Sequence, residues 1–170
     1  MKKQEEFYTI SIYIDENENL IGIPCGKSKK YGVADIDKVL LLKAPYTHER
    51  LEKYIEEVID ACYTKEHNDD SEVSTIEKYT KVKGFVNATA PYTLITLVKT
   101  NETYSLMPTF YDYERGPLLI DDDERILPAE YTPGELAAIF RDLIEVYVKA
   151  NVFYKEKEEL ERRKKASENK

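Results

Sequence analysis

The spacing of the apolar residues changes along the chain, and this change constrains the fold more than any other feature of the sequence. Residues 7–14 alternate apolar and polar side chains, which is the period of a strand with one buried face. Turn-forming residues fill positions 15–19, and residues 20–23 resume the apolar pattern before Pro24, so the two runs predict a β-hairpin. Residues 39–42 predict a third, more deeply buried strand.

The apolar spacing then becomes helical. In residues 47–65 the apolar side chains recur every three or four positions and share one helical face: Leu51, Tyr54, Ile55, Val58, Ile59 and Cys62. This pattern predicts a long helix over residues 47–65. Ser74 and Glu77 fit a capping box, in which each side chain satisfies a backbone donor of the other residue, and predict a short helix at 75–81.

The middle of the chain is rich in β-branched and aromatic residues, and predicts strands at 85–89, 92–99 and 103–109. In residues 92–98 both alternating sets of side chains are apolar or β-branched, which indicates a strand covered on both faces and therefore a central position. Two short apolar runs at 118–120 and 125–127 flank an acidic segment. They predict either a hairpin or two short strands joined by an exposed loop.

A second long helix is expected after Thr132, because Thr132 can act as the N-cap, Pro133 suits the first helical position and Glu135 completes a capping box. Its buried stripe consists of Leu136, Ile139, Phe140, Leu143 and Tyr147. Beyond residue 153 this stripe fades into alternating charges. We therefore expect one globular domain at 1–153, followed by a charged helical extension or a disordered tail at 154–170.

Strands and helices follow one another without strict alternation, which predicts the α+β class. We expect a mainly antiparallel sheet of about five or six strands, packed with two long helices and one short helix. The residues expected in its core are Leu51, Ile55, Val58, Leu94, Leu97, Ile139, Phe140 and Leu143.

Composition narrows the possible functions. The formal net charge is -8 and 34% of residues are charged, so the acidic body makes nucleic acid a poor partner. The longest aliphatic run, 39–42, is far too short to span a membrane, and the first residues are charged where a signal peptide would be apolar. We therefore expect a cytoplasmic protein with no membrane association, in which Cys25 and Cys62 are reduced thiols.

Two sequence patterns that resemble ligand-binding loops are each incomplete. The tripeptide Gly26-Lys27-Ser28 ends like a phosphate-binding loop, but Ile21 stands where that loop needs its first glycine. Residues 15–26 begin like a calcium-binding EF-hand loop, but Leu20 and Gly26 stand where a turn glycine and a bidentate glutamate are needed. We expect no cofactor at either position.

Catalytic and metal-binding residues are equally sparse. His48 and His67 lie near opposite ends of the first long helix and cannot share a metal through it, so with two cysteines no zinc site is expected. Cys25 lies in what reads as an accessible turn and is a possible nucleophile, whereas Cys62 belongs to an apolar helix face. No general base can be assigned to Cys25.

Acidic and tyrosine residues form the most unusual local pattern. Four contiguous carboxylates are expected to be exposed, either as a solvated loop or as an acidic docking surface: Asp121, Asp122, Asp123 and Glu124. The chain has 14 tyrosines, and Tyr111 and Tyr113 lie among charged residues, a mixture that suits a protein interface. Asp69 and Asp70, after the first long helix, provide a second acidic patch.

Four segments together resemble the contact-dependent growth inhibition immunity proteins of bacteria. These segments are the capped helix with Ile76-Glu77-Lys78-Tyr79-Thr80, the strands from Phe85 to Val98, the strand from Thr103 to Pro108-Thr109, and Gly134-Glu135-Leu136-Ala137-Ala138 at the start of the last helix. The resemblance covers roughly residues 74–143, and the preceding third of the chain agrees in size and in the order of its elements.

The resemblance implies a cytosolic protein without enzymatic activity that binds the C-terminal toxin domain of a contact-dependent effector and blocks its active site. Such toxins are often nucleases with basic clefts, which an acidic inhibitor can occupy. The expected toxin-binding residues are Asp121, Asp122, Asp123, Glu124, Asp69, Asp70, Tyr111 and Tyr113. Two alternatives stay open: a small cytosolic enzyme that uses Cys25 or a carboxylate cluster, and an acidic adaptor for another basic protein.

Overall fold

The alternating residues near the start of the chain form β1 (Tyr8–Ile14), which pairs antiparallel with β2 (Leu20–Ser28) as the predicted hairpin. The structure, a computed structural model, describes residues 7–169. Its other strands are β3 (Gly32–Asp35), β4 (Leu40–Leu42), β5 (Thr93–Lys99), β6 (Thr103–Asp112), β7 (Gly116–Leu119) and β8 (Arg125–Pro128).

Within residues 7–169 the strands form one eight-stranded sheet in the order β3-β2-β1-β5-β6-β7, in which β4 also pairs with β2 and β8 also pairs with β6. Every pairing between them is antiparallel. The α+β class and the antiparallel sheet are confirmed. The sheet exceeds five or six strands because β3 and several short strands add to it.

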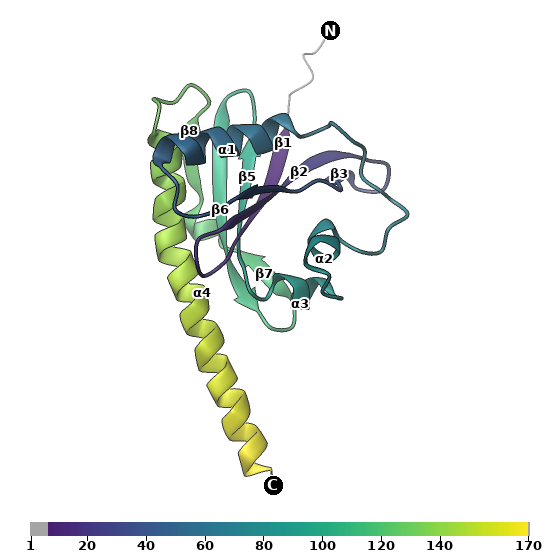
Figure 1. The fold of residues 1–170 in the computed structure, drawn as a ribbon, viewed down its shortest axis with the longest axis vertical. Coiled ribbons are helices and arrows are strands. Elements are labelled where there is room, and N and C mark those ends of the chain that lie inside the picture. The colour runs from purple at the N-terminus through teal and green to yellow at the C-terminus, as the bar shows by residue number, and fades with distance from the viewer. Residues whose placement is uncertain (1–6, 170) are drawn as a thin grey trace.

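Helices cover both faces of this sheet (Figure 1). The two long helices, α1 (His48–Asp60) and α4 (Glu135–Glu168), lie on the face toward which Ile10, Ile12 and Ile14 point. Two short helices, α2 (Thr75–Thr80) and α3 (Phe85–Thr89), pack on the opposite face around Tyr13. The period of two in β1 therefore separates two hydrophobic clusters.

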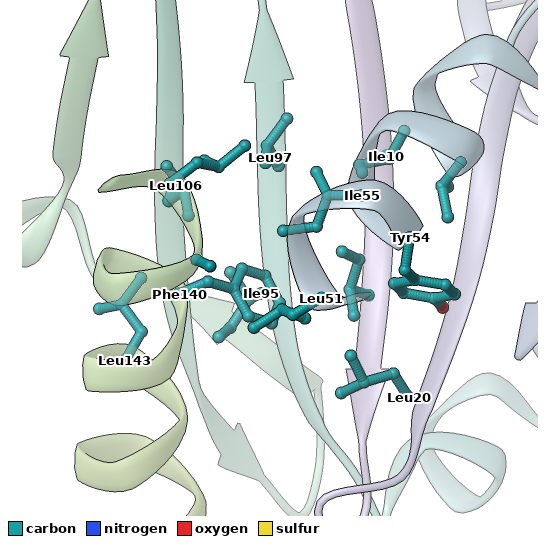
Figure 2. Packing of buried hydrophobic residues seen from close by; sticks show 14 of the residues in the cluster. Ile10, Leu20, Leu51, Tyr54, Ile55, Ile95, Leu97, Leu106, Phe140 and Leu143 are labelled. Atoms are coloured by element: carbon teal, nitrogen blue, oxygen red, sulfur yellow. The ribbon is translucent and has the colours of Figure 1, made fainter. Parts of the chain in front are cut away.

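The larger cluster joins α1 and α4 to the middle of the sheet. Figure 2 shows Leu51 and Ile55 of α1, with Phe140 and Leu143 of α4, among the side chains of Ile10, Leu20, Ile95, Leu97 and Leu106. Six of the eight residues predicted for the core are buried, and the other two, Leu94 and Ile139, are partly buried and pack against the two clusters. The helical and strand periodicities thus identified the buried surfaces correctly.

The first two predicted helices form where their caps indicated. Thr47 caps α1 by accepting a hydrogen bond from the Arg50 backbone amide at 3.1 Å. The capping box of α2 is complete, since the Ser74 amide donates to the Glu77 carboxylate at 2.8 Å and the Ser74 hydroxyl accepts from the Glu77 amide. Helix α1 ends at Asp60, earlier than predicted, and the chain turns at Tyr63, whose φ is 61°.

The predicted strand at 85–89 and the predicted N-cap of the second long helix are both wrong. Residues 85–89 form the single-turn helix α3 instead of a strand, beginning after Gly84, whose φ of 89° redirects the chain. Helix α4 begins at Glu135 and its N-cap is Gly134, so Thr132 does not cap it. The cap comes from α1: the Glu52 carboxylate accepts hydrogen bonds from Gly134 at 3.0 Å and from Ala137 at 3.2 Å.

The segment around Cys25, which was expected to form an accessible turn, belongs to β2 instead. The strand continues to Ser28 and pairs with β3, so Gly26-Lys27-Ser28 is extended backbone. A side chain at Gly26 would collide with the Ile36 side chain and the Lys65 carbonyl. Gly26 is therefore required by packing, and Cys25, expected in an accessible turn, is buried.

Helix α4 does not stop where its buried stripe ends. It continues unbroken to Glu168 and projects beyond the sheet as the yellow helix of Figure 1. Its side chains from Glu156 to Glu168 are exposed, and a Glu159–Arg163 ion pair of 3.1 Å connects successive turns. The charge alternation beyond residue 153 thus corresponds to a solvated helix.

Candidate protein-binding surface

The acidic run lies in the connection between β7 and β8, where Asp121–Asp123 forms one turn of 3-10 helix. The side chains of Asp121 and Asp122 are exposed and make no hydrogen bond or ion pair with any part of residues 7–169. Glu124, by contrast, accepts a hydrogen bond from the Ser105 hydroxyl of β6. The run therefore contains two carboxylates without a bonding partner in residues 7–169, Asp121 and Asp122, next to carboxylates that form hydrogen bonds within the protein.

Asp123 is the most constrained member of the run. Arg125 donates to its carboxylate from Nε at 2.6 Å and from Nη2 at 3.2 Å, and the Tyr147 hydroxyl of α4 donates at 2.5 Å. Arg125 and then Tyr147 hold the pKa of Asp123 below its usual value. Arg125 also reaches Asp142 at 2.9 Å, so this network fixes the acidic turn against α4.

The second predicted patch is divided in the same way. Asp69 accepts hydrogen bonds from the Ser28 hydroxyl at 2.5 Å and the Lys29 amide at 2.9 Å, which lower its pKa. Asp70 is exposed. Because Ser28 ends β2, whereas the acidic run adjoins β6, strands β1 and β5 lie between the two patches, a separation of about 14 Å across the sheet. The structure does not bring the patches together.

Tyr111 and Tyr113 do lie together, with ring centroids 5.3 Å apart, but both are anchored within the protein. The Tyr111 hydroxyl donates to the Val86 carbonyl at 3.0 Å, and the Tyr113 hydroxyl donates to the Lys155 carbonyl of α4 at 3.0 Å. The Arg162 guanidinium lies 4.2 Å from the centroid of the Tyr113 ring. These two tyrosines thus connect β6 to α3 and α4.

Three aromatic residues that the sequence did not single out are more exposed. Phe110 is 36% exposed, Tyr154 49% and Phe153 61%. Their rings form a continuous series, because Phe110 lies 5.4 Å from Tyr154, and Tyr154 lies 5.7 Å from Phe153. At its other end Phe110 contacts Tyr147 at 5.8 Å, the same Tyr147 that binds Asp123.

These contacts join the acidic turn to the exposed rings. We call Asp121, Asp122, Phe110, Phe153 and Tyr154 the acidic–aromatic surface. Tyr147, which binds the acidic turn, and Tyr154, which belongs to the surface, are separated along α4 by two helical turns, or about 10 Å. Free carboxylates next to exposed aromatic rings can supply both electrostatic attraction and apolar anchoring to a partner.

The sequence held a partial signal for this surface. The apolar stripe of the last helix fades near residue 153, where the charged residues begin, so Phe153 and Tyr154 lie at the limit of its buried part. The role of Tyr147 was not visible, because its bond to Asp123 connects residues 24 positions apart.

Cys25, the nucleophile proposed in the enzyme interpretation, is not accessible in the folded protein. Cys25 is 1% exposed, and its sulfur accepts a hydrogen bond from the Thr9 amide at 3.3 Å. His67 directs Nδ1 to the Asp35 carbonyl at 2.5 Å, so that nitrogen is engaged with the backbone. This arrangement offers neither an accessible thiol nor a base directed at it.

The oxygen atoms of the calcium-like segment are also engaged. The Asp15 carboxylate accepts hydrogen bonds from the Asn17 and Asn19 amides, each at 2.9 Å, and closes the β1–β2 turn. Among residues 7–169 no group of three or more histidine, cysteine or acidic side chains is arranged to hold a metal ion. In the same part of the chain, no helix is both long and apolar enough to cross a membrane.

Comparisons with known proteins define the fold. No protein-family model matches the chain, and no curated protein matches it. A solved protein of unknown function from Neisseria meningitidis is similar over 86% of this chain and 99% of its own, with a TM-score of 0.64 at 14% identity. A chain of the CdiA-CT/CdiI toxin and immunity complex from Yersinia pseudotuberculosis is similar over 84% of this chain and 97% of its own, with a TM-score of 0.56 at 11% identity.

Proposed function

We propose that this protein is a cytoplasmic immunity protein that binds and neutralises the toxin domain of a contact-dependent growth inhibition effector, without enzymatic activity of its own. The observation that carries the proposal is the acidic–aromatic surface. Asp121 and Asp122 have no role in holding the fold together, yet Arg125 and Tyr147 fix the turn that presents them. A partner accounts for this construction, whereas stability does not.

The comparisons support the same class of function. A chain of the toxin and immunity complex shares this fold at low identity, and that complex is an assembly of a toxin with its immunity protein. Residues 74–143 also resemble immunity proteins in sequence.

Charge indicates the chemistry of the partner. The chain carries a net charge of -8, and Asp121 and Asp122 place two carboxylates, unpaired within residues 7–169, in one exposed turn. A toxin that cleaves nucleic acid needs a basic cleft for phosphate groups, and carboxylates can occupy such a cleft. We therefore propose a basic toxin domain, of the nuclease class, as the partner.

The test is the double substitution Asp121→Ser with Asp122→Ser. The ligand is the toxin domain encoded in the neighbouring reading frame, and stopped-flow association is measured at two ionic strengths. We expect association at low salt to slow by about three- to tenfold and its salt dependence to weaken. The melting temperature should stay unchanged, because neither carboxylate has a partner in the described chain.

A matched control removes the same charge elsewhere. Asp60→Ser with Glu66→Ser changes two exposed acidic residues at and after the end of α1, and should leave association nearly unchanged. An equal effect of both pairs would show that net charge acts instead of this surface. If the wild-type protein neither binds the domain nor protects cells that express it, the immunity function itself is wrong.

A further inference from the structure

Two buried thiols meet where the ladder between β1 and β2 ends. The paired register stops at Ile10 and Pro24, and the next residue of β1, Thr9, bonds to sulfur instead. Its amide donates to Cys25 Sγ at 3.3 Å, and its carbonyl accepts from Cys62 Sγ at 3.9 Å. The Cys25 carbonyl, which would have continued the ladder, accepts from the Tyr63 amide at 2.8 Å.

This geometry brings the two sulfur atoms together. The amide and carbonyl of one strand residue point to the same side, so both sulfurs occupy the same edge of Thr9. The Cys25–Tyr63 hydrogen bond holds β2 against the residue that follows Cys62, so the backbones of the two cysteines lie side by side. The neighbouring Cys62 thiol lowers the pKa of Cys25 to about 7, and the neighbouring Cys25 thiol together with burial raises the pKa of Cys62.

We propose that Cys25 and Cys62 are a redox-active pair that hydrogen peroxide converts into an intramolecular disulfide. The Cys25 thiolate attacks one peroxide oxygen, the O–O bond breaks, and the departing hydroxide takes a proton to leave as water, giving a sulfenic acid. The Cys62 sulfur then attacks the Cys25 sulfur. The S–O bond breaks, and the Cys62 proton leaves with the hydroxyl group as a second water.

The site suits a small oxidant. Cys62 is 7% exposed, and Tyr63, which follows it directly, is 39% exposed, so the thiol pair lies just beneath the surface. Peroxide is little larger than water and needs only a brief local opening to reach it. A larger disulfide such as oxidised glutathione would require much more of the surface to move.

The disulfide would connect β2 to the end of α1. It would close the loop formed by residues 26–61, restrict the unfolded chain and so favour the folded state. This inference does not depend on the identity of any toxin.

The test treats the folded full-length protein with hydrogen peroxide, blocks remaining thiols with an alkylating agent and measures the intact mass. We expect both thiols to be lost together, the mass to fall by two hydrogen atoms, and a Cys25–Cys62 linked peptide that a dithiol reductant removes. The oxidised monomer should melt at a higher temperature than the reduced monomer.

Single variants assign the roles. Cys62→Ser should stop at a sulfenic acid on Cys25 that dimedone traps, and Cys25→Ser should form no intramolecular cross-link and no dimedone adduct at position 25. Oxygen added to wild-type protein without a cross-link would overturn the proposal. Reaction of wild-type protein only in denaturant, or disulfides only between molecules, would do the same.

Discussion

Asp35 is the carboxyl group with the least favourable surroundings at neutral pH. It lies at the end of β3, where the Ser11 hydroxyl donates to it at 3.5 Å, and no ion pair compensates its charge within residues 7–169. Burial raises its pKa to about 6, although the Ser11 hydrogen bond and the charge of His67 oppose that change. The folded protein therefore holds this proton more tightly than the unfolded chain does.

Asp35→Asn should raise the free energy of unfolding at pH 7.5 by on the order of 1 to 2 kcal/mol. Because the pKa of Asp35 is higher in the folded protein than in the unfolded chain, protonation of Asp35 favours folding. This contribution is complete below the unfolded pKa of about 4 and is lost as the pH rises through the folded pKa of about 6. The gain from the asparagine should accordingly vanish near pH 4. Urea denaturation of both proteins from pH 4 to 8 measures the difference.

Asp60→Asn is the control, because Asp60 is exposed on α1. A gain that is equally large for Asp60→Asn, or that persists at pH 4, would mean that the carboxyl of Asp35 is not the cause.

Among the elements, α4 depends most on another part of the chain for its start. The Glu52 carboxylate of α1 accepts hydrogen bonds from Gly134 and Ala137, replacing the cap that Thr132 was expected to provide. A carboxylate at this end also opposes the positive end of the helix dipole. The contact therefore couples the two long helices that cover the same sheet face.

Glu52→Ala should destabilise the protein by about 1 to 2 kcal/mol, because two donors at the helix start lose their acceptor. Glu52→Gln should recover part of the loss, since an amide oxygen accepts these hydrogen bonds without the charge. Guanidinium unfolding supplies the values, with the exposed Lys53→Ala as the neutral comparison. Equal stability of Glu52→Ala and Lys53→Ala would exclude this capping role.

The helices and strands also show how much of the fold could be predicted from the sequence. Strong periodicity over many residues predicted α1, α4, β1 and β5, and local caps predicted α2. Residues 85–89 were mistaken for a strand because a short apolar run has too few residues to distinguish a period of two from 3.6. The prediction that Thr132 caps α4 was wrong because the capping pattern is read from neighbouring residues, whereas the hydrogen bond from Gly134 to Glu52 joins residues that are 82 positions apart.

The candidate surface follows the same pattern. Contiguous charge predicted the exposure of Asp121 and Asp122. It could not show that Asp123 is held by Tyr147 or that Tyr113 is held by Lys155, because those bonds depend on where α4 crosses the sheet. Nor could it show that Tyr111 is held by Val86, because that bond depends on where α3 packs.

For the whole molecule, the position of α4 on the sheet is set by the buried Asn151. Its amide nitrogen donates to the Thr109 carbonyl at 3.0 Å and to the Thr93 hydroxyl at 3.2 Å, and its oxygen accepts from the Tyr111 amide at 2.9 Å. A shift of α4 by one turn would leave these groups unpaired, so α4 has one register on β5 and β6. Beyond this point contacts with the body become fewer, and stability should decline along the helix.

Hydrogen exchange should reproduce this gradient. Amides of β5, which lies between β1 and β6, should exchange most slowly, at rates close to those of global unfolding. Amides of α4 beyond Glu156 should exchange much faster than those from Leu136 to Val148, which pack in the core. Uniform protection along α4 would show that the projecting half is covered in solution.

The covering of one sheet face by both α1 and α4 has a consequence for biosynthesis. Ribosomes produce β1 to β8 before α4, so the strands leave the exit tunnel while part of their apolar face, including Leu97 and Leu106, still lacks the side chains of Phe140 and Leu143. Until α4 is translated, the nascent chain exposes a surface that favours aggregation. A ribosomal pause within the codons for α4 therefore prolongs the interval in which a chaperone must shield the emerging sheet.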